Sequence, residues 1–400
     1  MTRPSIDRRR KQPATAKLRI KNFRRNSSDF IAIEHLANRC QFLGYAEVFN
    51  TAPAQEGESL VYAALRVLYE PNAARKGLLT HRTADLWRAG KLSLHADHGL
   101  DMPPVPERPA RDDTVQLVEP KKMKRLGKGG TLASRQALVH SLVHIESWAV
   151  DLSWDIIARF GSDTTYRLPR EFFDDFVTVA EDECRHHELL RNRLENMGSH
   201  YGAFAAHEAL WDSAMATAHS LPARLAVEHA VHEARGLDVM PSTIRKFRLN
   251  GDEQTARLLE NVVYKEEITH CAAGVRWLSY LHGLAHTTSV PASEGPSSAS
   301  NEAGDVQGHA GSTPEWMAEA RRHSSVETWF HELVQTHFRG SLKPPFNVEA
   351  REQAGFGPEW YMPLATQPKT AAIAETLQED SVCMQLQGSE LASAEAMATV

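Results

Sequence analysis

The chain has 400 residues, a formal net charge of −6, and 42% hydrophobic against 24% charged residues. These values are ordinary for a globular protein, and the charge gives no general reason to expect a nucleic-acid partner. No run of 18 apolar residues occurs in the sequence, so neither a membrane-spanning helix nor a membrane partner is expected.

The N-terminal part of the chain is expected to be partly irregular. Residues 1–28 form a basic arm in which Asp7 is the only acid, and a solvated, disordered arm is the simplest interpretation. A mitochondrial presequence and a nuclear signal are the alternatives to a cytoplasmic protein with such an arm. Residues 29–125 mix short helical stretches such as GESLVYAALRVLY with the proline-rich connector DMPPVPERPARDD, which cannot be regular helix.

Residues 126–285 carry long patterns of period 3.6 and predict a bundle of four helices. The helices are expected from about Leu132 to Phe160, from near Pro169 to near Met197, from near Pro222, and from about Asp252 to about Leu284. A segment of roughly 25 residues separates the second and third helices, whereas the other connections are short. Four helices with one long crossover form the ferritin-like arrangement, so the predicted fold class is all-α, with helical segments flanking the bundle.

Three segments are expected after the bundle. Residues 286–312 form a low-complexity linker. Residues 313–367 return to a helical pattern, continue as an extended segment rich in aromatic residues, and are expected to pack on the bundle. Residues 368–400 lack a core pattern and are expected to be a tail.

Each predicted bundle helix has one glutamate near the middle of its apolar stripe, which steps of three and four residues trace along one face. The four stripe glutamates are Glu146, Glu183, Glu233 and Glu267. In the second and fourth helices a histidine follows three residues later, and these are His186 and His270. Glu146 and Glu183 are 37 residues apart, and Glu233 and Glu267 are 34 apart, so the pattern is a repeat of helix pairs.

A metal centre explains why carboxylates lie on apolar helix faces. An isolated buried carboxylate is very costly, and like charges close together raise one another's pKa. Two divalent cations balance four glutamates and two neutral imidazoles, and this ligand set is that of carboxylate-bridged di-iron or di-manganese bundles. Three alternatives stay open: surface acids on partly exposed helices, His187 in place of His186, and Glu228 in place of Glu233.

Residues near the stripe glutamates are candidates for orienting the ligands. They are His144, Asp151, His229, His232, Arg235 and Asp238. Glu266 is interpreted as a solvated neighbour. The four cysteines, Cys40, Cys184, Cys271 and Cys383, are scattered without a CxxC pair. This argues against a disulfide scaffold or a zinc ribbon, favours a reducing intracellular compartment, and makes Cys184 and Cys271 small buried thiols.

The strings HSLVHIESWAVDLSWD, EDECRHHELL, VHEARGLDVMP and VYKEEITHCAAGVRWL resemble the ferritin-like proteins of an uncharacterised domain-of-unknown-function family. The resemblance covers roughly residues 55–285 and 325–365. More distantly, the sequence is similar to the ferritin-like tRNA hydroxylase that oxidises a prenylated adenosine. The resemblance implies a di-iron centre with the six residues above as ligands. Several di-iron hydroxylases have a threonine where this chain has Leu237, so a threonine-assisted proton relay is not expected.

The function expected from a di-iron centre is an oxygen-activating oxidoreductase. Two iron ions, with manganese as the alternative in one or both positions, are expected to react with O₂ and oxidise a small-molecule substrate. Substrate and electron donor are unidentified. The alternatives are a metal-handling or peroxide-scavenging ferritin-like protein, and a module whose metal only stabilises the fold. The basic stretch KKMKRLGKGG leaves tRNA open as a partner, although solvated charge is the simpler interpretation.

Overall fold

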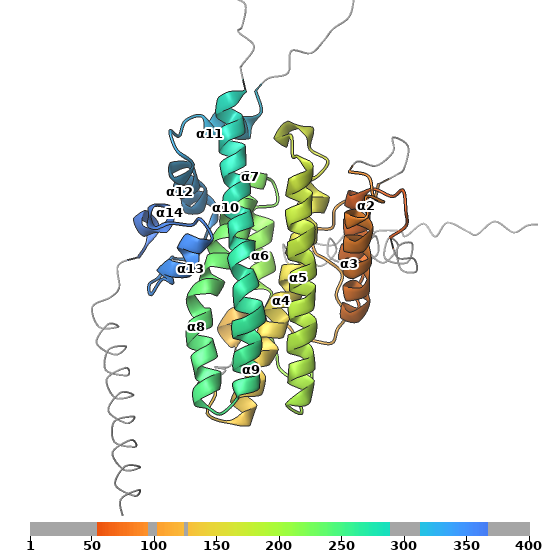
Figure 1. Cartoon of the computed structure of the whole chain (residues 1–400), viewed down its shortest axis with the longest axis vertical. Helices are drawn as coiled ribbons and strands as arrows, with labels where there is room; N and C mark the ends of the chain where they lie inside the picture. The colour runs from red at the N-terminus through yellow and green to blue at the C-terminus, as the bar shows by residue number, and fades with distance from the viewer. Residues whose placement is uncertain (1–53, 95–101, 124–126, 289–312, 367–400) are drawn as a thin grey trace, which may run out of the picture. The chain divides into compact units, whose positions relative to one another are not determined.

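The computed structural model describes residues 54–94, 102–123, 127–288 and 313–366 (Figure 1). Within these ranges the chain forms helices and isolated β-bridges but no strand, so the predicted all-α class is confirmed. The predicted basic arm, the tail 368–400 and residues 289–312 of the predicted linker lie outside the described residues. No helix in the described ranges combines the length and apolar character that crossing a membrane requires.

Four long helical runs form the bundle (Figure 1). Two are continuous helices, α4 (Leu132–Phe160) and α5 (Arg170–Asn196). The third run consists of α7 (Leu221–Ala226), the π-helical segment η3 (Val227–His232) and α8 (Glu233–Leu249). The fourth consists of α9 (Glu253–Leu258), the π-helical segment η4 (Leu259–Val263) and α10 (Tyr264–Thr287). The predicted long crossover between the second and third runs is present and contains α6 (Ala209–Ala216).

The residues at the helix ends explain why the bundle helices begin where they do. Thr131 Oγ1 accepts a hydrogen bond from the N–H of Ser134 at the start of α4. Pro169 precedes α5, and the Asp252 carboxylate accepts from a backbone N–H three residues later at the start of α9. The Thr131 and Asp252 side chains satisfy helix N–H groups that have no partner within the helix, whereas Pro169 makes no such bond and marks the start of α5 through its ring.

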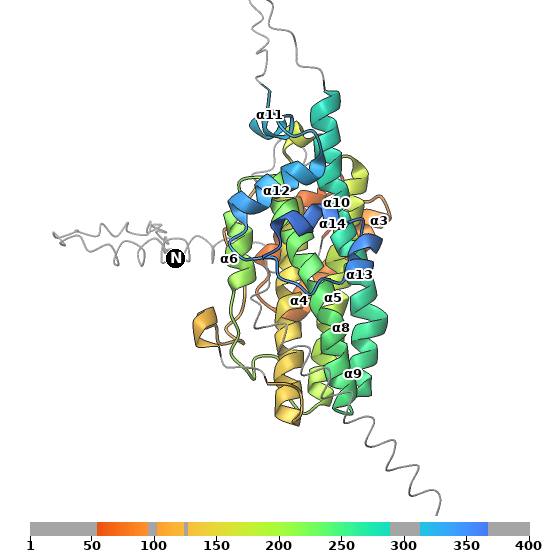
Figure 2. The same ribbon diagram turned by 90° about the vertical axis from the view of Figure 1, so that its left-hand side faces the viewer.

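Two groups of shorter helices cover the bundle. The first group, α2 (Leu60–Tyr69) and α3 (Ala73–Arg88), packs on α4 and α5 (Figure 1). The second group lies mainly against α7, α8 and α10 (Figure 2), and comprises α11 (Glu315–Ala320), α12 (Val326–His337), α13 (Val348–Gln353) and α14 (Pro358–Tyr361). Single 3-10 turns are η1 (Pro120–Lys122), η2 (Thr164–Tyr166) and η5 (Met362–Leu364).

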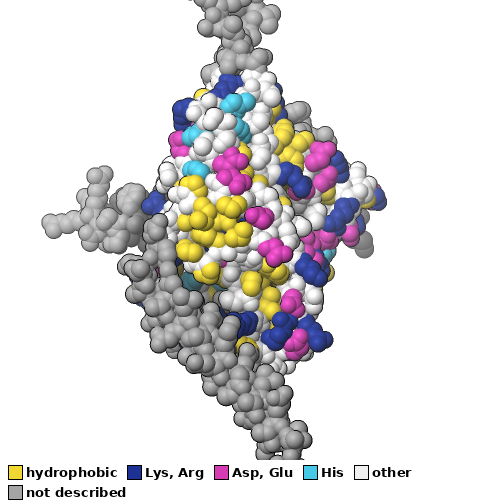
Figure 3. All heavy atoms as spheres, turned by 60° about the vertical axis from the view of Figure 1, so that its left-hand side comes forward, with side chains coloured by type: hydrophobic (Ala, Val, Ile, Leu, Met, Phe, Trp, Pro, Cys, Tyr) yellow, Lys and Arg dark blue, Asp and Glu magenta, His cyan; other side chains and the backbone are white. Residues whose placement is uncertain are grey.

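The C-terminal segment differs from the prediction, because residues 341–364 were expected to be extended and instead contain α13 and α14. Asn347 caps α13 by accepting a hydrogen bond from the N–H of Ala350, and Pro358 begins α14. Figure 3 shows the side on which these helices lie. Hydrophobic side chains gather there in a patch, and acidic and basic side chains of the described residues are intermixed around it (Figure 3).

Apolar layers lie on both sides of the middle of the bundle. One layer contains Val139, Val143, Leu190, Leu194, Met240, Ile244, Phe247, Leu259 and Val263, all buried. In the other layer the ring of Phe172 packs 4.8 Å from that of Phe176 and 5.3 Å from that of Trp277. Along the bundle helices, the stripe glutamates fall between the residues of these two layers. They therefore lie away from both ends of the bundle.

The third and fourth helical runs approach one another very closely at Gly274 of α10. A Cβ at this position would lie 1.9 Å from the carbonyl oxygen of His229 in η3. Only glycine fits such an approach, because real Cβ atoms are not found within 3.0 Å of other heavy atoms. The π-helical segment and the glycine together set how close α10 lies to the third run.

Candidate metal centre

The structure brings all six residues predicted as ligands to one place inside the bundle. The side-chain donor atoms form two groups, and within each group they lie within 4.8 Å of one another. The first group is Glu146, Glu183, His186 and Glu267. The second group is Glu183, Glu233, Glu267 and His270. Glu183 of α5 and Glu267 of α10 belong to both groups, so they lie between the other four.

Both imidazoles turn their Nδ1 atoms toward the carboxylates. His270 Nδ1 lies 3.0 Å from Glu183 Oε1 and 3.8 Å from Glu267 Oε2. His186 Nδ1 lies 3.5 Å from Glu183 Oε2, 3.6 Å from Glu267 Oε1 and 3.8 Å from Glu146 Oε2. The two rings are 5.7 Å apart between centroids. The donor atoms therefore converge from both sides on the shared carboxylates.

Burial argues against exposed helix faces for five of the six clustered residues. The exposed fractions are 4% for Glu146, 1% for Glu183, 7% for Glu267, 0% for His186 and 2% for His270. Glu233 is partly exposed. Three buried atoms of the cluster, Glu183 Oε2, His186 Nδ1 and His270 Nδ1, have no hydrogen-bond partner among the described residues. Buried polar atoms are normally paired, so donors and acceptors that face one another here without hydrogen bonds are an arrangement that a cation could satisfy.

The pKa values of several cluster residues are shifted because buried carboxyl and imidazole groups lie close together. Burial, then the charges of Glu183 and Glu267, raise the pKa of the Glu146 and Glu233 carboxyls well above the usual range. Burial would also raise the pKa of Glu183, but His270 and His186 hold it well below its usual value. Burial opposes the charged form of His186, yet its neighbouring carboxylates raise its pKa to about 12. With protein groups alone, protons on the acids and imidazoles balance the cluster, and divalent cations would replace them.

Two acids outside the cluster orient the imidazoles. His186 Nε2 donates to Glu266 Oε2 at 2.6 Å, and His270 Nε2 lies 3.5 Å from Asp182 Oδ2. Arg185 pairs with both acids, at 2.9 Å from Glu266. Carboxylates at the far nitrogen of a metal-binding histidine fix its ring and tautomer. Glu266 is therefore more than the solvated neighbour that was predicted, and Asp182 was missed, although each directly precedes the glutamate of a Glu-x-x-His motif.

The six candidates for orienting the ligands make other contacts in the structure. Asp151 pairs with Lys76 and Arg111, and Asp238 pairs with Arg351, so both attach flanking segments to the bundle. His144 Nδ1 bonds the Tyr201 hydroxyl at 2.9 Å. His229 packs on Phe176, His232 bonds Ser213, and Arg235 is exposed near Lys343. The sequence shows that these residues lie near the stripe glutamates along the helices, but it does not show which residues they contact.

The structure places neither alternative ligand in the cluster. His187 lies on another face of α5, where its ring packs against Tyr201 and lines a cavity of about 60 Å³. Burial, then nearby cations such as Arg191, lower its pKa to about 3. Glu228 is buried in η3, where its Oε2 lies 3.8 Å from His232 Nε2. The cluster is therefore built from His186 and Glu233.

Both helices of the second pair contain π-helical turns close to the cluster. The segment η3 ends at His232, directly before Glu233, and η4 ends at Val263, four residues before Glu267. Such turns in otherwise α-helical runs are rare and occur frequently at functional sites. They carry no residue signature that the sequence analysis could have used.

Comparison with known proteins identifies the family. The sequence model of a family described as "Protein of unknown function (DUF455)" matches residues 69–293 and 305–362, which include all six clustered residues. An uncharacterized protein of Haemophilus influenzae is 36% identical over 153 residues. That alignment covers 37% of this chain and 53% of the relative, so the chain spans about half the length of the relative. No solved structure matches the chain. Because the family model matches well over half of its residues, the chain belongs to the DUF455 family of proteins of unknown function.

Proposed function

We propose that the chain is an oxygen-activating oxidoreductase of the ferritin-like, carboxylate-bridged di-iron class. In this proposal Glu146, Glu183, His186, Glu233, Glu267 and His270 hold two iron ions, or manganese in one or both positions. The observation that carries it is the pair of overlapping buried donor groups with Glu183 and Glu267 in common. A carboxylate that belongs to both donor groups is placed as a ligand bridging two metal ions would be.

The donor set fits iron and manganese. Carboxylate oxygens and imidazole nitrogens suit these ions better than metals that prefer thiolate. Four carboxylates and two neutral imidazoles balance two divalent cations. Asp182 and Glu266 hold the far nitrogens of His270 and His186, which leaves each Nδ1 directed at the cluster.

The chain's own contribution is to place the ions and to keep the surroundings dry. When bound, two such metal ions would provide the chemistry for reducing O₂ and oxidising an organic substrate. Apolar side chains such as Phe176, Val179 and Leu190 flank the α5 ligands and are all buried, so they exclude bulk water. The substrate is proposed to be a small organic molecule, and a separate electron donor is required for monooxygenation.

The test is anaerobic loading with Fe(II), followed by exposure to O₂ and Mössbauer spectroscopy. We expect two irons per chain, O₂ consumption by the reduced protein, and the spectrum of a coupled diferric pair. Glu183→Ala and Glu267→Ala should each lose iron, whereas Glu253→Ala, at an exposed glutamate paired with Arg248 and Arg257, should retain it.

Three results would contradict the proposal in different ways. Retention of two irons by both ligand variants would overturn the ligand assignment. Iron far in excess of two per chain would favour metal storage. Two bound irons that do not react with O₂ would favour a metal centre that only stabilises the fold.

A further inference from the structure

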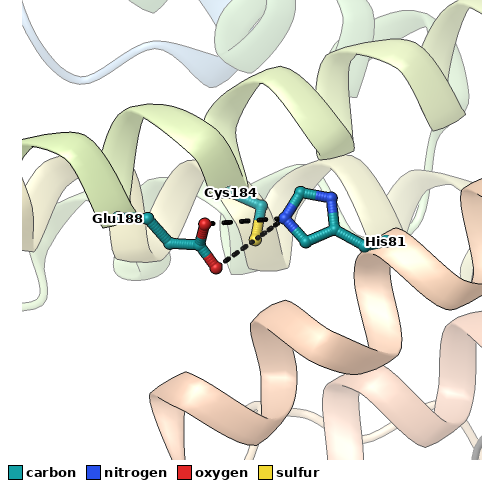
Figure 4. Close-up of side chains that lie close together, drawn as sticks. All are labelled: His81, Cys184 and Glu188. Atoms are coloured by element: carbon teal, nitrogen blue, oxygen red, sulfur yellow. Dashed lines mark hydrogen bonds and ion pairs between the residues drawn. The ribbon is translucent and has the colours of Figure 1, made fainter.

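We propose that His81, Cys184 and Glu188 form a separate site for a single zinc ion, where α3 packs on α5. The three side chains face one another across the two helices (Figure 4), and their donor atoms lie within 4.8 Å of one another. Cys184 is buried, whereas His81 and Glu188 are partly exposed. None of the three belongs to the carboxylate cluster, so the site does not depend on the function proposed above.

The separations between donor atoms suit tetrahedral zinc. Cys184 Sγ lies 3.8 Å from His81 Nε2 and 3.9 Å from Glu188 Oε1, and His81 Nε2 lies 3.6 Å from Glu188 Oε2. Zinc bonds of about 2.3 Å to sulfur and about 2.0–2.2 Å to nitrogen and oxygen give tetrahedral edges of about 3.3–3.6 Å. The observed atoms need to move inward by only a few tenths of an ångström. Half-exposed His81 and Glu188 side chains have the freedom to do so.

A further acid holds the histidine in place. Glu181 Oε1 lies 3.4 Å from His81 Nδ1, on the far side of the ring from the other donors. Arg88 pairs with the second oxygen of Glu181 at 2.5 Å and fixes that carboxylate. A carboxylate on the nitrogen that does not bind the ion is the usual partner of a zinc-ligating histidine. This contact is independent of the three-residue geometry.

Gly77, one turn before His81 on α3, leaves the space that the site needs. A Cβ at Gly77 would lie 2.8 Å from Glu188 Oε1 and 3.3 Å from Cys184 Sγ. Glycine is unfavourable inside a helix relative to alanine, so its presence in α3 calls for a local reason. Here it allows two donor side chains of α5 to reach under α3.

The donors also separate this site from the carboxylate cluster chemically. Thiolate with imidazole and carboxylate is a donor set for zinc, whereas the cluster has only oxygen and imidazole donors. Three protein ligands leave a fourth position for water. The ion would compensate the negative charges of Glu181 and Glu188 and would fasten α3 to α5.

Cobalt(II) is the probe, because a thiolate ligand gives an intense near-ultraviolet charge-transfer band that the oxygen and nitrogen donors of the cluster do not give. The experiment uses the full chain with Cys40→Ser and Cys383→Ser, which removes two thiols outside the described residues. We expect the intensity of the band to correspond to one thiolate-bound cobalt ion per chain. The band should disappear when zinc displaces the cobalt.

Variants identify the ligands. Cys184→Ser should abolish the band, and Cys271→Ser, at the other buried cysteine, should leave it unchanged. His81→Ala should raise the cobalt Kd by more than about 100-fold, beyond the range typical of an outer partner, whereas His286→Ala on exposed α10 surface should not. His81 is partly exposed, so this variant is expected to fold, which helical circular dichroism checks.

The outcomes distinguish this site from the proposed di-iron centre. Glu267→Ala should lose iron from the cluster and keep the cobalt–thiolate band. The inference is overturned if the parent chain shows no band, if the band survives Cys184→Ser, or if Cys271→Ser removes it.

Discussion

Asp182 of α5 lies 3.5 Å from Nε2 of His270 on α10, so the helix that carries one imidazole of the cluster supports the imidazole of the other. The relationship is reciprocal, because Glu266 of α10 accepts a hydrogen bond from His186 of α5 at 2.6 Å. Arg185 joins the two acids. The two Glu-x-x-His helices therefore form one linked unit in which each fixes the ring orientation of the other.

The first prediction concerns these supporting acids. Asp182→Ala and Glu266→Ala should each weaken iron binding by about 10–100-fold without removing either ion position, because they orient ligands rather than bind metal. Competitive Fe(II) titration against a chromophoric chelator measures the change. Glu260→Ala, at an exposed glutamate paired with Arg248, is the matched control. Unchanged iron affinity in both variants would show that the imidazoles do not need these acids.

The second prediction concerns the close approach at Gly274. Gly274→Ala should lower the free energy of unfolding by about 3 kcal/mol, because the new Cβ meets the His229 carbonyl oxygen at 1.9 Å and forces α10 away from η3. Gly283→Ala on the same helix is the control, since nothing lies within 4 Å of its Cβ, and it should stabilise by about 0.5–1 kcal/mol. Urea unfolding of both variants provides the comparison. Equal effects of the two substitutions would contradict the steric account.

Much of the bundle was predictable because its signals are local. Thr131, Pro169 and Asp252 mark helix starts through their own side chains or ring, and the stripe glutamates follow from helical period alone. The two π-helical turns were not predictable, since no residue type or spacing marks them in the sequence. Which residue of another helix a side chain contacts depends on how the helices pack, and the sequence does not show this.

The same distinction explains the site. The sequence shows which residues share a helix face, so the six clustered residues could be named in advance. It does not show which side chain of the neighbouring helix meets each ring, so Asp182 and Glu266 were not assigned. The site formed by His81 with Cys184 and Glu188 was missed for the same reason, because its histidine comes from a helix about 100 residues earlier in the chain.

The third prediction concerns a buried ion pair that ties the crossover to the bundle. Asp155 of α4 pairs with Arg224 and also accepts from Arg159 Nε at 3.0 Å, and Arg224 Nη2 donates to the carbonyl of Ala214 in α6 at 2.8 Å. Asp155→Asn should lower the free energy of unfolding at pH 7 by about 3–5 kcal/mol, since it leaves a buried guanidinium without its partner.

This contribution should depend on pH in a definite direction. Burial would raise the pKa of Asp155, but Arg224 and Arg159 hold it below its usual value. A depressed folded-state pKa stabilises the protein above the unfolded pKa of about 3.9, and the effect is lost as pH falls further. Urea unfolding from pH 7 to pH 3 should show the difference between parent and variant shrinking below about pH 4. Arg257 and Arg248 also lower the pKa of Glu253, but solvent screens this exposed ion pair, so Glu253→Gln should show a much smaller change in the same direction.

The fourth prediction separates Glu228 from Glu233. Glu228 is buried in η3, and neither of its carboxylate oxygens has a hydrogen-bond partner in the part of the chain that the structure describes. Glu233 instead belongs to the carboxylate cluster. Glu228→Gln should therefore keep two irons per chain, and Glu233→Gln should lose iron from one position. The opposite pattern of iron loss would exchange the two assignments.

The stability of the Glu228 variant gives a second readout. Burial raises the pKa of Glu228, so the folded protein holds this proton more tightly than the unfolded chain. The resulting stability is complete below the unfolded pKa of about 4.3 and is lost as pH rises through the folded pKa. Glu228→Gln resembles the protonated acid at every pH, so it should match the parent near pH 4. By pH 8 it should be more stable than the parent by about 1.4 kcal/mol for each unit by which folding raises the pKa. A variant that is less stable than the parent at pH 8 would show that the Glu228 charge has a compensating partner.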